Sequence, residues 1–471
     1  MLPLVRLRAA HPVTSRCPSL RRRLAGFGLV ALLALGLAAP LRPVAASIFN
    51  PESFTLANGL QVVVLINDRL PVVTQMVWYK VGAADDPPGK SGLAHFLEHL
   101  MFRGTGDIAP GEFSRIVSRN GGVDNAFTSS DTTAYYQTVA ADRLELVMKL
   151  ESDRMANLAL DEKEVLPERQ VIIEERRSRT ENSPGALLRE QMNAMQFLNH
   201  PYHIPIIGWR HEMAGLTRDD AIAFYKQHYA PNNAILIVSG DVTVDKVRAL
   251  AEKYYGPIKS LPIPARVRRQ EPPQIAARRV TLESERVREP QFSRSYLAPS
   301  YSTGAKEHAY ALQVLDTILS GGATSRLYGR LVVEKELAVS VSASYDVDNY
   351  DWGTFSVSGQ PRGEITLAAL ESAVDGEIAG LLKDGVTQEE LDHAKKQLIA
   401  SSIYALDSLR QGAQTIGTAL TNGQTIADAE AWPERIEAVT VEQVNAAARH
   451  VFDITQSVTG YLLPAKPEKR S

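Results

Sequence analysis

The segment that decides how this chain folds is HFLEHLMFRGT, residues 95–105. A proline- and glycine-containing loop precedes it, and Ser91 stands where a helix N-cap is expected. The pattern therefore predicts a helix from Ser91 to about Met101. Apolar residues surround the two histidines and indicate that this helix packs on a core; they are Leu93, Phe96, Leu97, Leu100 and Met101.

His95 and His99 are four residues apart, so they share one face of the predicted helix and can bind one metal ion. A catalytic zinc ion takes three protein ligands and keeps a fourth position for water. Two imidazoles therefore need one more ligand, preferably a carboxylate. Glu98 flanks the same face and should stay off the metal, where it can take a proton from the water. The alternative is a surface helix with two solvated histidines, which the apolar neighbours disfavour.

A second acidic helix offers the missing ligand. Residues 168–175 read ERQVIIEE, and Pro167 can occupy the first turn of this helix. Glu168 and Glu175 are seven residues apart and share a face, whereas Glu174 points elsewhere and is expected to be solvated. Two inward carboxylates separated by two turns suit one metal ligand and one group that supports a ligand. The spacing leaves open which carboxylate takes which role.

Residues 1–46 have the pattern of a secretory signal. They carry seven arginines and no acidic residue, followed by an apolar run at residues 24–40 and by the small-residue site Val44-Ala45-Ala46. The apolar run is short for a bilayer span, which needs about 20 residues. An uncleaved anchor stays an alternative, and the cluster Arg21-Arg22-Arg23 leaves twin-arginine export open. We expect a periplasmic or secreted protein with no membrane span after cleavage.

Composition and charge limit the class of protein. The 471 residues, with 44% hydrophobic and 22% charged residues, predict a globular chain of two to four domains. Loss of the seven arginines lowers the net charge from −3 to −10, which argues against nucleic acid as a partner. The single cysteine, Cys17, lies in the signal. The mature chain therefore has neither disulfides nor thiol chemistry.

The first half alternates strands and helices. Strands are expected at residues 60–66, 72–79, 123–128, 132–139 and 234–238, and helices dominate residues 142–198. A segment rich in proline and arginine, SLPIPARVRRQEPP, begins at Ser260 and lacks periodicity. We interpret it as an interdomain linker.

The second half repeats the order of the first. A strand at 291–296, a helix at 306–319, a break at Gly321-Gly322 and strands at 338–345 and 353–358 precede long helices. This order predicts a duplicated unit. The expected fold is α+β, with two tandem domains that each contain a mostly antiparallel sheet covered by helices. The predicted divisions are 1–46 (signal), 47–259 (N-terminal domain), 260–275 (linker) and 276–465 (C-terminal domain).

The strings HFLEHLMFRGT and ERQVIIEE together resemble the pitrilysin/insulinase family of zinc peptidases, whose metal motif is the inverted HxxEH of the inverzincins. The similarity covers essentially the whole mature chain and is greatest to short two-domain bacterial members and to mitochondrial processing peptidase subunits. It implies one Zn²⁺ per chain. It also implies that Glu175 is the third ligand, that Glu168 supports the histidines, and that Glu98 is the general base.

The same resemblance implies how a peptide substrate binds. Asn125, Ala126 and Phe127 match an edge strand that pairs with an extended peptide through backbone hydrogen bonds. An ordinary strand and turn is the alternative for each of these residues alone. Family members also pair as clamshell dimers, so we expect either a self-dimer or a heterodimer with a second family subunit, enclosing a chamber.

One departure from the family matters. Active members place an arginine and a tyrosine, seven residues apart, where they stabilise the oxyanion of the tetrahedral intermediate. Here these positions are Val332 and Val339, although the preceding Ser325-Arg326-Leu327 is intact. We therefore expect the zinc-bearing subunit of a heterodimer whose partner supplies the pair. Substitute donors stay possible: Arg326, Arg330 or Tyr345.

The expected activity is zinc-dependent endopeptidase cleavage of extended or unfolded peptides. The alternative from another class is a non-catalytic assembly or core subunit of a larger complex. Such related chains typically lose metal ligands, whereas His95, His99 and Glu175 are all present here.

Overall fold

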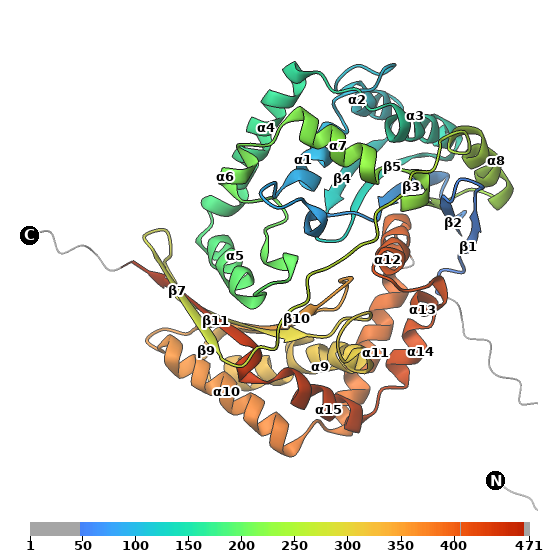
Figure 1. Cartoon of the computed structure of the whole chain (residues 1–471). Coiled ribbons are helices and arrows are strands. Elements are labelled where there is room, and N and C mark those ends of the chain that lie inside the picture. Colours follow the sequence, from blue (N-terminus) through green and yellow to red (C-terminus); the bar gives the residue numbers. More distant parts are fainter. Residues whose placement is uncertain (1–47, 406, 466–471) are drawn as a thin grey trace, which may run out of the picture. The chain divides into compact units, whose positions relative to one another are not determined.

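The computed structural model describes residues 48–405 and 407–465. These residues form two sheets with helices packed against them (Figure 1). The predicted signal at residues 1–46 lies outside the described residues and stays a prediction. Within the described part of the chain, no helix is long and apolar enough to span a membrane.

The first sheet has the strand order β1-β2-β6-β3-β5-β4. The β2–β6 pair is parallel and the other pairs are antiparallel. The strands are β1 (Glu52–Thr55), β2 (Gln61–Ile66), β3 (Val72–Tyr79), β4 (Val123–Thr128), β5 (Thr133–Ala140) and β6 (Ala234–Gly240). Its helices are α1 (Leu93–Leu100), α2 (Glu112–Arg119), α3 (Leu144–Asn157), α4 (Glu162–Arg176), α5 (Pro184–Gln196), α6 (Arg210–Met213), α7 (Arg218–His228) and α8 (Val244–Tyr254).

The second sheet has the order β7-β11-β8-β10-β9, again with one parallel pair, β7–β11. The strands are β7 (Arg278–Ser284), β8 (Gln291–Ala298), β9 (Ala338–Asp346), β10 (Gly353–Pro361) and β11 (Ser457–Pro464). Its half contains α9 (Ala309–Ser320), α10 (Leu367–Asp384), α11 (Gln388–Ala405), α12 (Leu409–Thr421), α13 (Ile426–Glu430), α14 (Trp432–Glu437) and α15 (Val441–Val451).

The two sheets share one topology. In chain order within each half, β2, β3, β4, β5 and β6 correspond to β7, β8, β9, β10 and β11, and β1 is an addition to the first sheet. The prediction of a duplicated α+β unit with mostly antiparallel sheets is therefore confirmed. The exact residues at which the domains divide stay a prediction.

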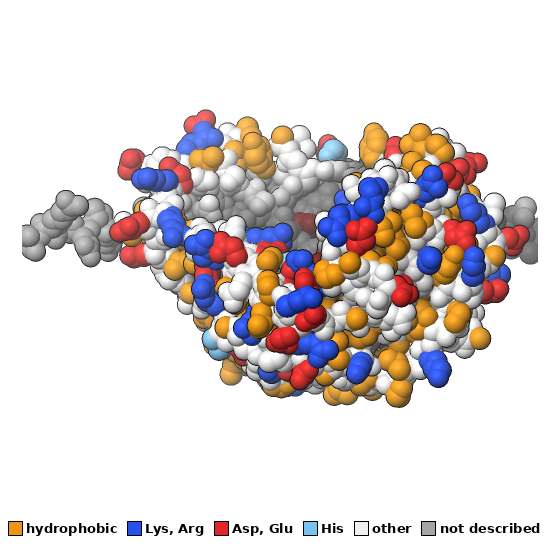
Figure 2. Space-filling view, turned by 90° about the horizontal axis from the view of Figure 1, so that it is seen from above, with side chains coloured by type: hydrophobic (Ala, Val, Ile, Leu, Met, Phe, Trp, Pro, Cys, Tyr) orange, Lys and Arg blue, Asp and Glu red, His pale blue; other side chains and the backbone are white. Residues whose placement is uncertain are grey.

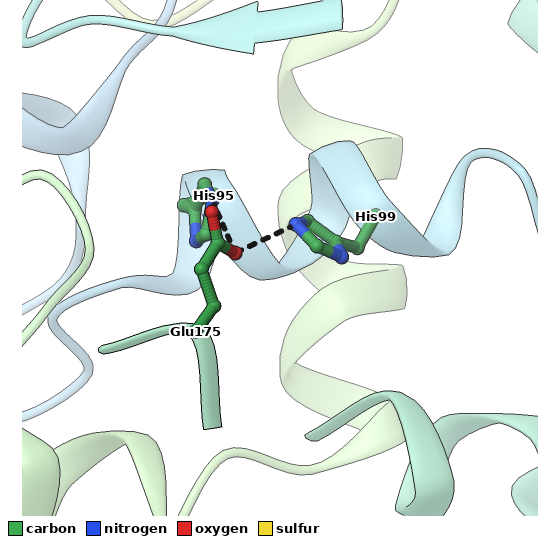
Figure 3. A group of neighbouring side chains, drawn as sticks. All are labelled: His95, His99 and Glu175. Carbon is green, nitrogen blue, oxygen red and sulfur yellow. Dashed lines mark ion pairs between the residues drawn. The ribbon is translucent and has the colours of Figure 1, made fainter. Parts of the chain in front are cut away.

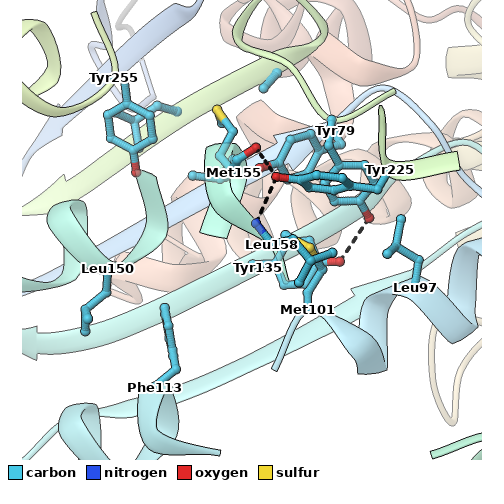
Figure 4. Close-up of a cluster of buried hydrophobic side chains, with 14 of the residues drawn as sticks. Tyr79, Leu97, Met101, Phe113, Tyr135, Leu150, Met155, Leu158, Tyr225 and Tyr255 are labelled. Carbon is cyan, nitrogen blue, oxygen red and sulfur yellow. Dashed lines mark hydrogen bonds between the residues drawn. The ribbon is translucent and has the colours of Figure 1, made fainter. Parts of the chain in front are cut away.

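One face of the first sheet packs against α1, α3 and their neighbours in a large apolar core (Figure 4). Tyr225 enters this core with its hydroxyl group bonded. The Tyr225 hydroxyl donates to the carbonyl of Met155 at 2.7 Å and accepts from the N–H of Leu158 at 3.3 Å. These bonds remove the cost of burying a hydroxyl group and tie the end of α3 to α7.

The opposite face of the first sheet is covered by α12, which belongs to the second half of the chain. Ala413 and Ile416 pack there against Met76, Trp78 and Ile235. The two halves therefore share a hydrophobic cluster. Over the molecular face shown in Figure 2, acidic and basic side chains are interspersed.

The segment interpreted as a linker is bonded to both halves. Arg268 contacts Asp85 at 2.5 Å and Asp131 at 2.9 Å in the first half, and Asp351 at 3.4 Å in the second. Glu271 accepts backbone hydrogen bonds from residues 198–200. Ion pairs therefore fix this segment against both halves of the chain.

Candidate metal centre

The start of α1 is held by a carboxylate from the loop that precedes it. Asp86 accepts the N–H groups of Gly92 at 2.7 Å, Leu93 at 3.2 Å and Ala94 at 2.8 Å. The prediction that Ser91 caps this helix is wrong. Gly92 is the N-cap in a left-handed conformation, φ 84°, and the Ser91 hydroxyl instead accepts the N–H of Trp209 at 2.8 Å. This left-handed turn favours glycine because it lacks a Cβ.

Two helices bring three ligand-type side chains together (Figure 3). His95 and His99 lie one turn apart on α1, and Glu175 lies near the end of α4. Oε2 of Glu175 is 3.6 Å from Nε2 of His95 and 3.3 Å from Nε2 of His99. One ligand atom from each residue lies within 4.8 Å of the others. The three residues selected from the sequence therefore meet at one point.

Glu168 contacts the side of the His99 ring that faces away from Glu175. Its Oε1 lies 2.7 Å from Nδ1 of His99, and its Oε2 pairs with the guanidinium of Arg103. A carboxylate on Nδ1 keeps the proton there and leaves Nε2 directed at Glu175. The predicted start of α4 is wrong, because the helix begins at Glu162 and contains Pro167 in its interior.

Glu98 is buried beside the histidines and stays off the ligand group. Its Oε2 accepts a 2.5 Å hydrogen bond from the Thr128 hydroxyl at the end of β4. Burial raises the pKa of Glu98, although the bond from Thr128 opposes this. A carboxylate with a raised pKa is a better proton acceptor near neutral pH.

The pKa values of the two histidines are shifted in opposite directions. Burial, together with the nearby His99, lowers the pKa of His95 to about 4. Burial also disfavours the charged form of His99, but its contacts with Glu168 and Glu175 outweigh this and raise its pKa to about 9. Without a metal, His99 therefore holds a proton between two carboxylates. A metal that binds Nε2 of His99 must displace that proton.

The donor set fits zinc. Two imidazole nitrogens and one carboxylate oxygen are the ligands of many catalytic zinc sites. Oε2 of Glu175 is buried. Its contacts with the two Nε2 atoms, at 3.6 and 3.3 Å, do not have hydrogen-bond geometry, so a cation held between these three atoms would satisfy it. The other oxygen of Glu175 is held by Arg179 at 2.8 Å, which orients the carboxylate.

The predicted substrate strand is β4, which lies at the edge of the first sheet. Asn125 is exposed, Ala126 packs on the main core, and the Phe127 ring meets the Trp78 ring edge-on at 5.3 Å. Asn125 is therefore the most exposed of the three, and Ala126 and Phe127 are partly buried. The assigned roles in peptide binding stay predictions.

The positions expected to carry the family arginine and tyrosine offer no polar group. Val332 is 6% exposed in the second core, and Val339 is 52% exposed on β9. Each substitute donor already has a partner. Arg326 pairs with Glu390, Arg330 pairs with Glu377, and the Tyr345 hydroxyl donates to the carbonyl of Pro299.

Three residues at the centre were not singled out from the sequence: Asp86, Arg103 and Thr128. Arg103 lies within the quoted HFLEHLMFRGT string, but only the contact between α1 and α4 places it beside Glu168. Thr128 lies in the predicted substrate strand, and only the tertiary structure shows its bond to Glu98.

Comparisons with known proteins identify relatives of this chain. Residues 62–209 match the family model described as insulinase (peptidase family M16), and residues 215–398 match the one described as peptidase M16 inactive domain. The zinc protease PqqE of Helicobacter pylori is 34% identical over 94% of this chain and 99% of its own length. An uncharacterised zinc protease of Mycobacterium leprae is 31% identical over 85% of this chain and 88% of its own.

Solved structures show the same fold. A protease from Helicobacter pylori superposes with a TM-score of 0.83 at 34% identity, covering 88% of this chain and 99% of that one. The first half of the periplasmic protease PqqL from Escherichia coli has a TM-score of 0.74 at 20% identity, covering 88% and 92%. The chain therefore belongs to the insulinase family of peptidases, peptidase family M16.

Proposed function

We propose that this chain is a zinc metalloendopeptidase that cleaves extended or unfolded peptides, and that it is the zinc-bearing subunit of a heterodimer. The observation that carries the proposal is the meeting of His95, His99 and Glu175 beside the buried carboxylate of Glu98. The proposed domains are 47–259 and 276–465, joined by 260–275. The signal pattern in residues 1–46 supports a periplasmic or secreted location.

Each residue of the centre has a separate role in the proposed reaction. His95, His99 and Glu175 would hold the ion, which when bound would act as a Lewis acid and lower the pKa of a water molecule. Glu98 takes a proton from the attacking water and delivers it to the leaving amine. Glu168 and Arg103 keep His99 oriented, and β4 pairs with the peptide backbone.

The heterodimer is supported by Val332 and Val339, because a valine side chain donates no hydrogen bond to an oxyanion. The same two residues favour the second candidate, a non-catalytic subunit of an assembly. Zinc content separates the two, because an assembly subunit has no need for an intact ligand set.

The test is made on the purified chain from residue 47 onward. Zinc is measured by mass spectrometry, and cleavage is measured with a quenched, unstructured peptide. We expect about one zinc per chain, a low rate of cleavage by the chain alone, and a large increase when a family subunit that carries the arginine and tyrosine is added.

Two variants serve as controls. Glu98→Gln should keep zinc and lose cleavage, whereas His95→Ala should lose zinc. A full enzyme's rate from the chain alone would refute the heterodimer, and absence of zinc from the wild type would favour the assembly subunit.

A further inference from the structure

Arg410 is a cation without a carboxylate partner near the substrate strand. It lies in the first turn of α12, and its guanidinium sits 5.4 Å from the ring centroid of Tyr136. Its Nη1 donates to the Tyr136 hydroxyl at 3.1 Å. Among residues 48–405 and 407–465, no acidic group lies within ion-pair distance of it. Asp407, one turn earlier, pairs with Arg69 at 2.6 Å.

Tyr136 links this cation to β4. In the β4–β5 pair Tyr136 lies directly opposite Asn125, so the two side chains share one face of the sheet. Paired side chains in a sheet are about 5 Å apart, and an added strand lies about 4.8 Å further out. A peptide side chain opposite Asn125 on this face would therefore come within reach of a long arginine side chain that lies over Tyr136.

The distance of Asn125 from the residue that bonds to Glu98 can be counted along β4. Thr128 bonds to Glu98, and Asn125 lies three residues before Thr128. A strand advances about 3.3 Å per residue, so the two positions are roughly 10 Å apart. A peptide side chain beside Asn125 would belong to a residue about three positions from the one that pairs beside Thr128.

We propose that Arg410 and Asn125 form a subsite for an acidic side chain of the substrate, about three residues along β4 from Thr128. This inference rests on the proposed function, because it requires a peptide paired with β4. The amide of Asn125 supplies a neutral hydrogen-bond donor, and Arg410 supplies the charge. The mature chain is net acidic, so its overall field favours basic peptides. A local preference for an acidic side chain is thus distinguishable from the field of the whole molecule.

Binding, not cleavage, tests the subsite, so the result does not depend on a partner subunit. The background is the zinc-loaded chain carrying Glu98→Gln. Three fluorescent peptides alternate Ser with Glu, with Gln or with Lys, so that slippage by two residues leaves the pattern unchanged. Fluorescence anisotropy gives the Kd for each peptide.

Four further substitutions are compared in that background. Arg410→Glu should shift the ratio of the Kd values for the Glu and Lys peptides toward the Lys peptide by about 10-fold, and Arg410→Gln by about 3-fold. Arg410→Lys should keep the original preference. Arg449→Glu, the same charge change at an exposed position on α15, should leave the ratio nearly unchanged.

The outcomes separate the two proposals. If no peptide binds, the proposed function fails at peptide pairing with β4. If all peptides bind and Arg410→Glu shifts the ratio no more than Arg449→Glu, the subsite is refuted and the proposed function stands. A thermal melt of each variant shows whether Arg410 only supports the docking of α12; in that case the melting temperature falls and the ratio stays constant.

Discussion

At the scale of single residues, the orientation of His99 depends on Glu168. Its carboxylate accepts from Nδ1 of His99 and is itself held by Arg103. Loss of such a supporting carboxylate typically weakens metal binding by about 10- to 100-fold. We therefore expect Glu168→Gln to lower zinc affinity by that factor, measured by competition with a chromogenic chelator.

Glu174→Gln is the matched control. Glu174 lies on the same helix, but its side chain is 60% exposed and pairs with Arg177. Its replacement should leave zinc affinity within about twofold of the wild type, because exposed ion pairs contribute little. Equal affinities for the two variants would remove Glu168 from the metal centre.

At the scale of elements, α1 is a short helix whose start is satisfied by a residue outside it. Asp86 accepts three backbone N–H groups at this end. Removing a single capping side chain costs about 0.5–2 kcal/mol, and a buried acceptor shared by three donors belongs at the upper end. We expect Asp86→Ala to lower the free energy of unfolding of the zinc-free chain by about 2 kcal/mol in urea denaturation.

Asp142→Ala tests the specificity of that effect. Asp142 has a side chain that is 71% exposed, and it forms an ion pair with Arg143 at 3.9 Å. A change within about 0.5 kcal/mol is expected at such a surface position. A loss of stability at Asp142 as large as that at Asp86 would contradict the capping role.

At the scale of the whole molecule, α12 joins the two halves by packing on the first sheet. Gly417 permits this contact, because a Cβ there would lie 2.1 Å from the Trp78 ring. Gly417→Ala should therefore lower the free energy of unfolding by about 1–3 kcal/mol through overpacking. Chemical denaturation followed by Trp fluorescence measures the change.

Gly380→Ala is the matched control for that substitution. Gly380 also lies inside a helix, α10, but a Cβ there would meet nothing within 4 Å. Alanine should stabilise this helix by about 0.5–1 kcal/mol, because glycine has the lower helix propensity. If Gly417→Ala also stabilised the chain, the contact between α12 and Trp78 would not limit the packing of the halves.

Features that depend on residues close together in the chain could be predicted from the amino-acid sequence. The four-residue spacing of His95 and His99 puts both on one helix face, and the seven-residue spacing selected Glu168 and Glu175 over Glu174. Alternation and element order predicted the strands and the duplicated unit, because strand period and turn chemistry depend on near neighbours. The family resemblance then implied that Glu175 is the metal ligand and that Glu168 supports the histidines.

Contacts between residues in different elements could not be predicted from local spacing, because they depend on how the elements pack. The packing of α4 on α1 brings Glu175 to the histidines and Glu168 to Arg103, and the end of β4 brings Thr128 to Glu98. The cap of α1 by Asp86 and the place of Pro167 inside α4 were missed, because tertiary packing overrides local cap and breaker preferences. The position of Arg410 over Tyr136 depends on docking a helix of the second half against the sheet of the first, and no local spacing encodes that.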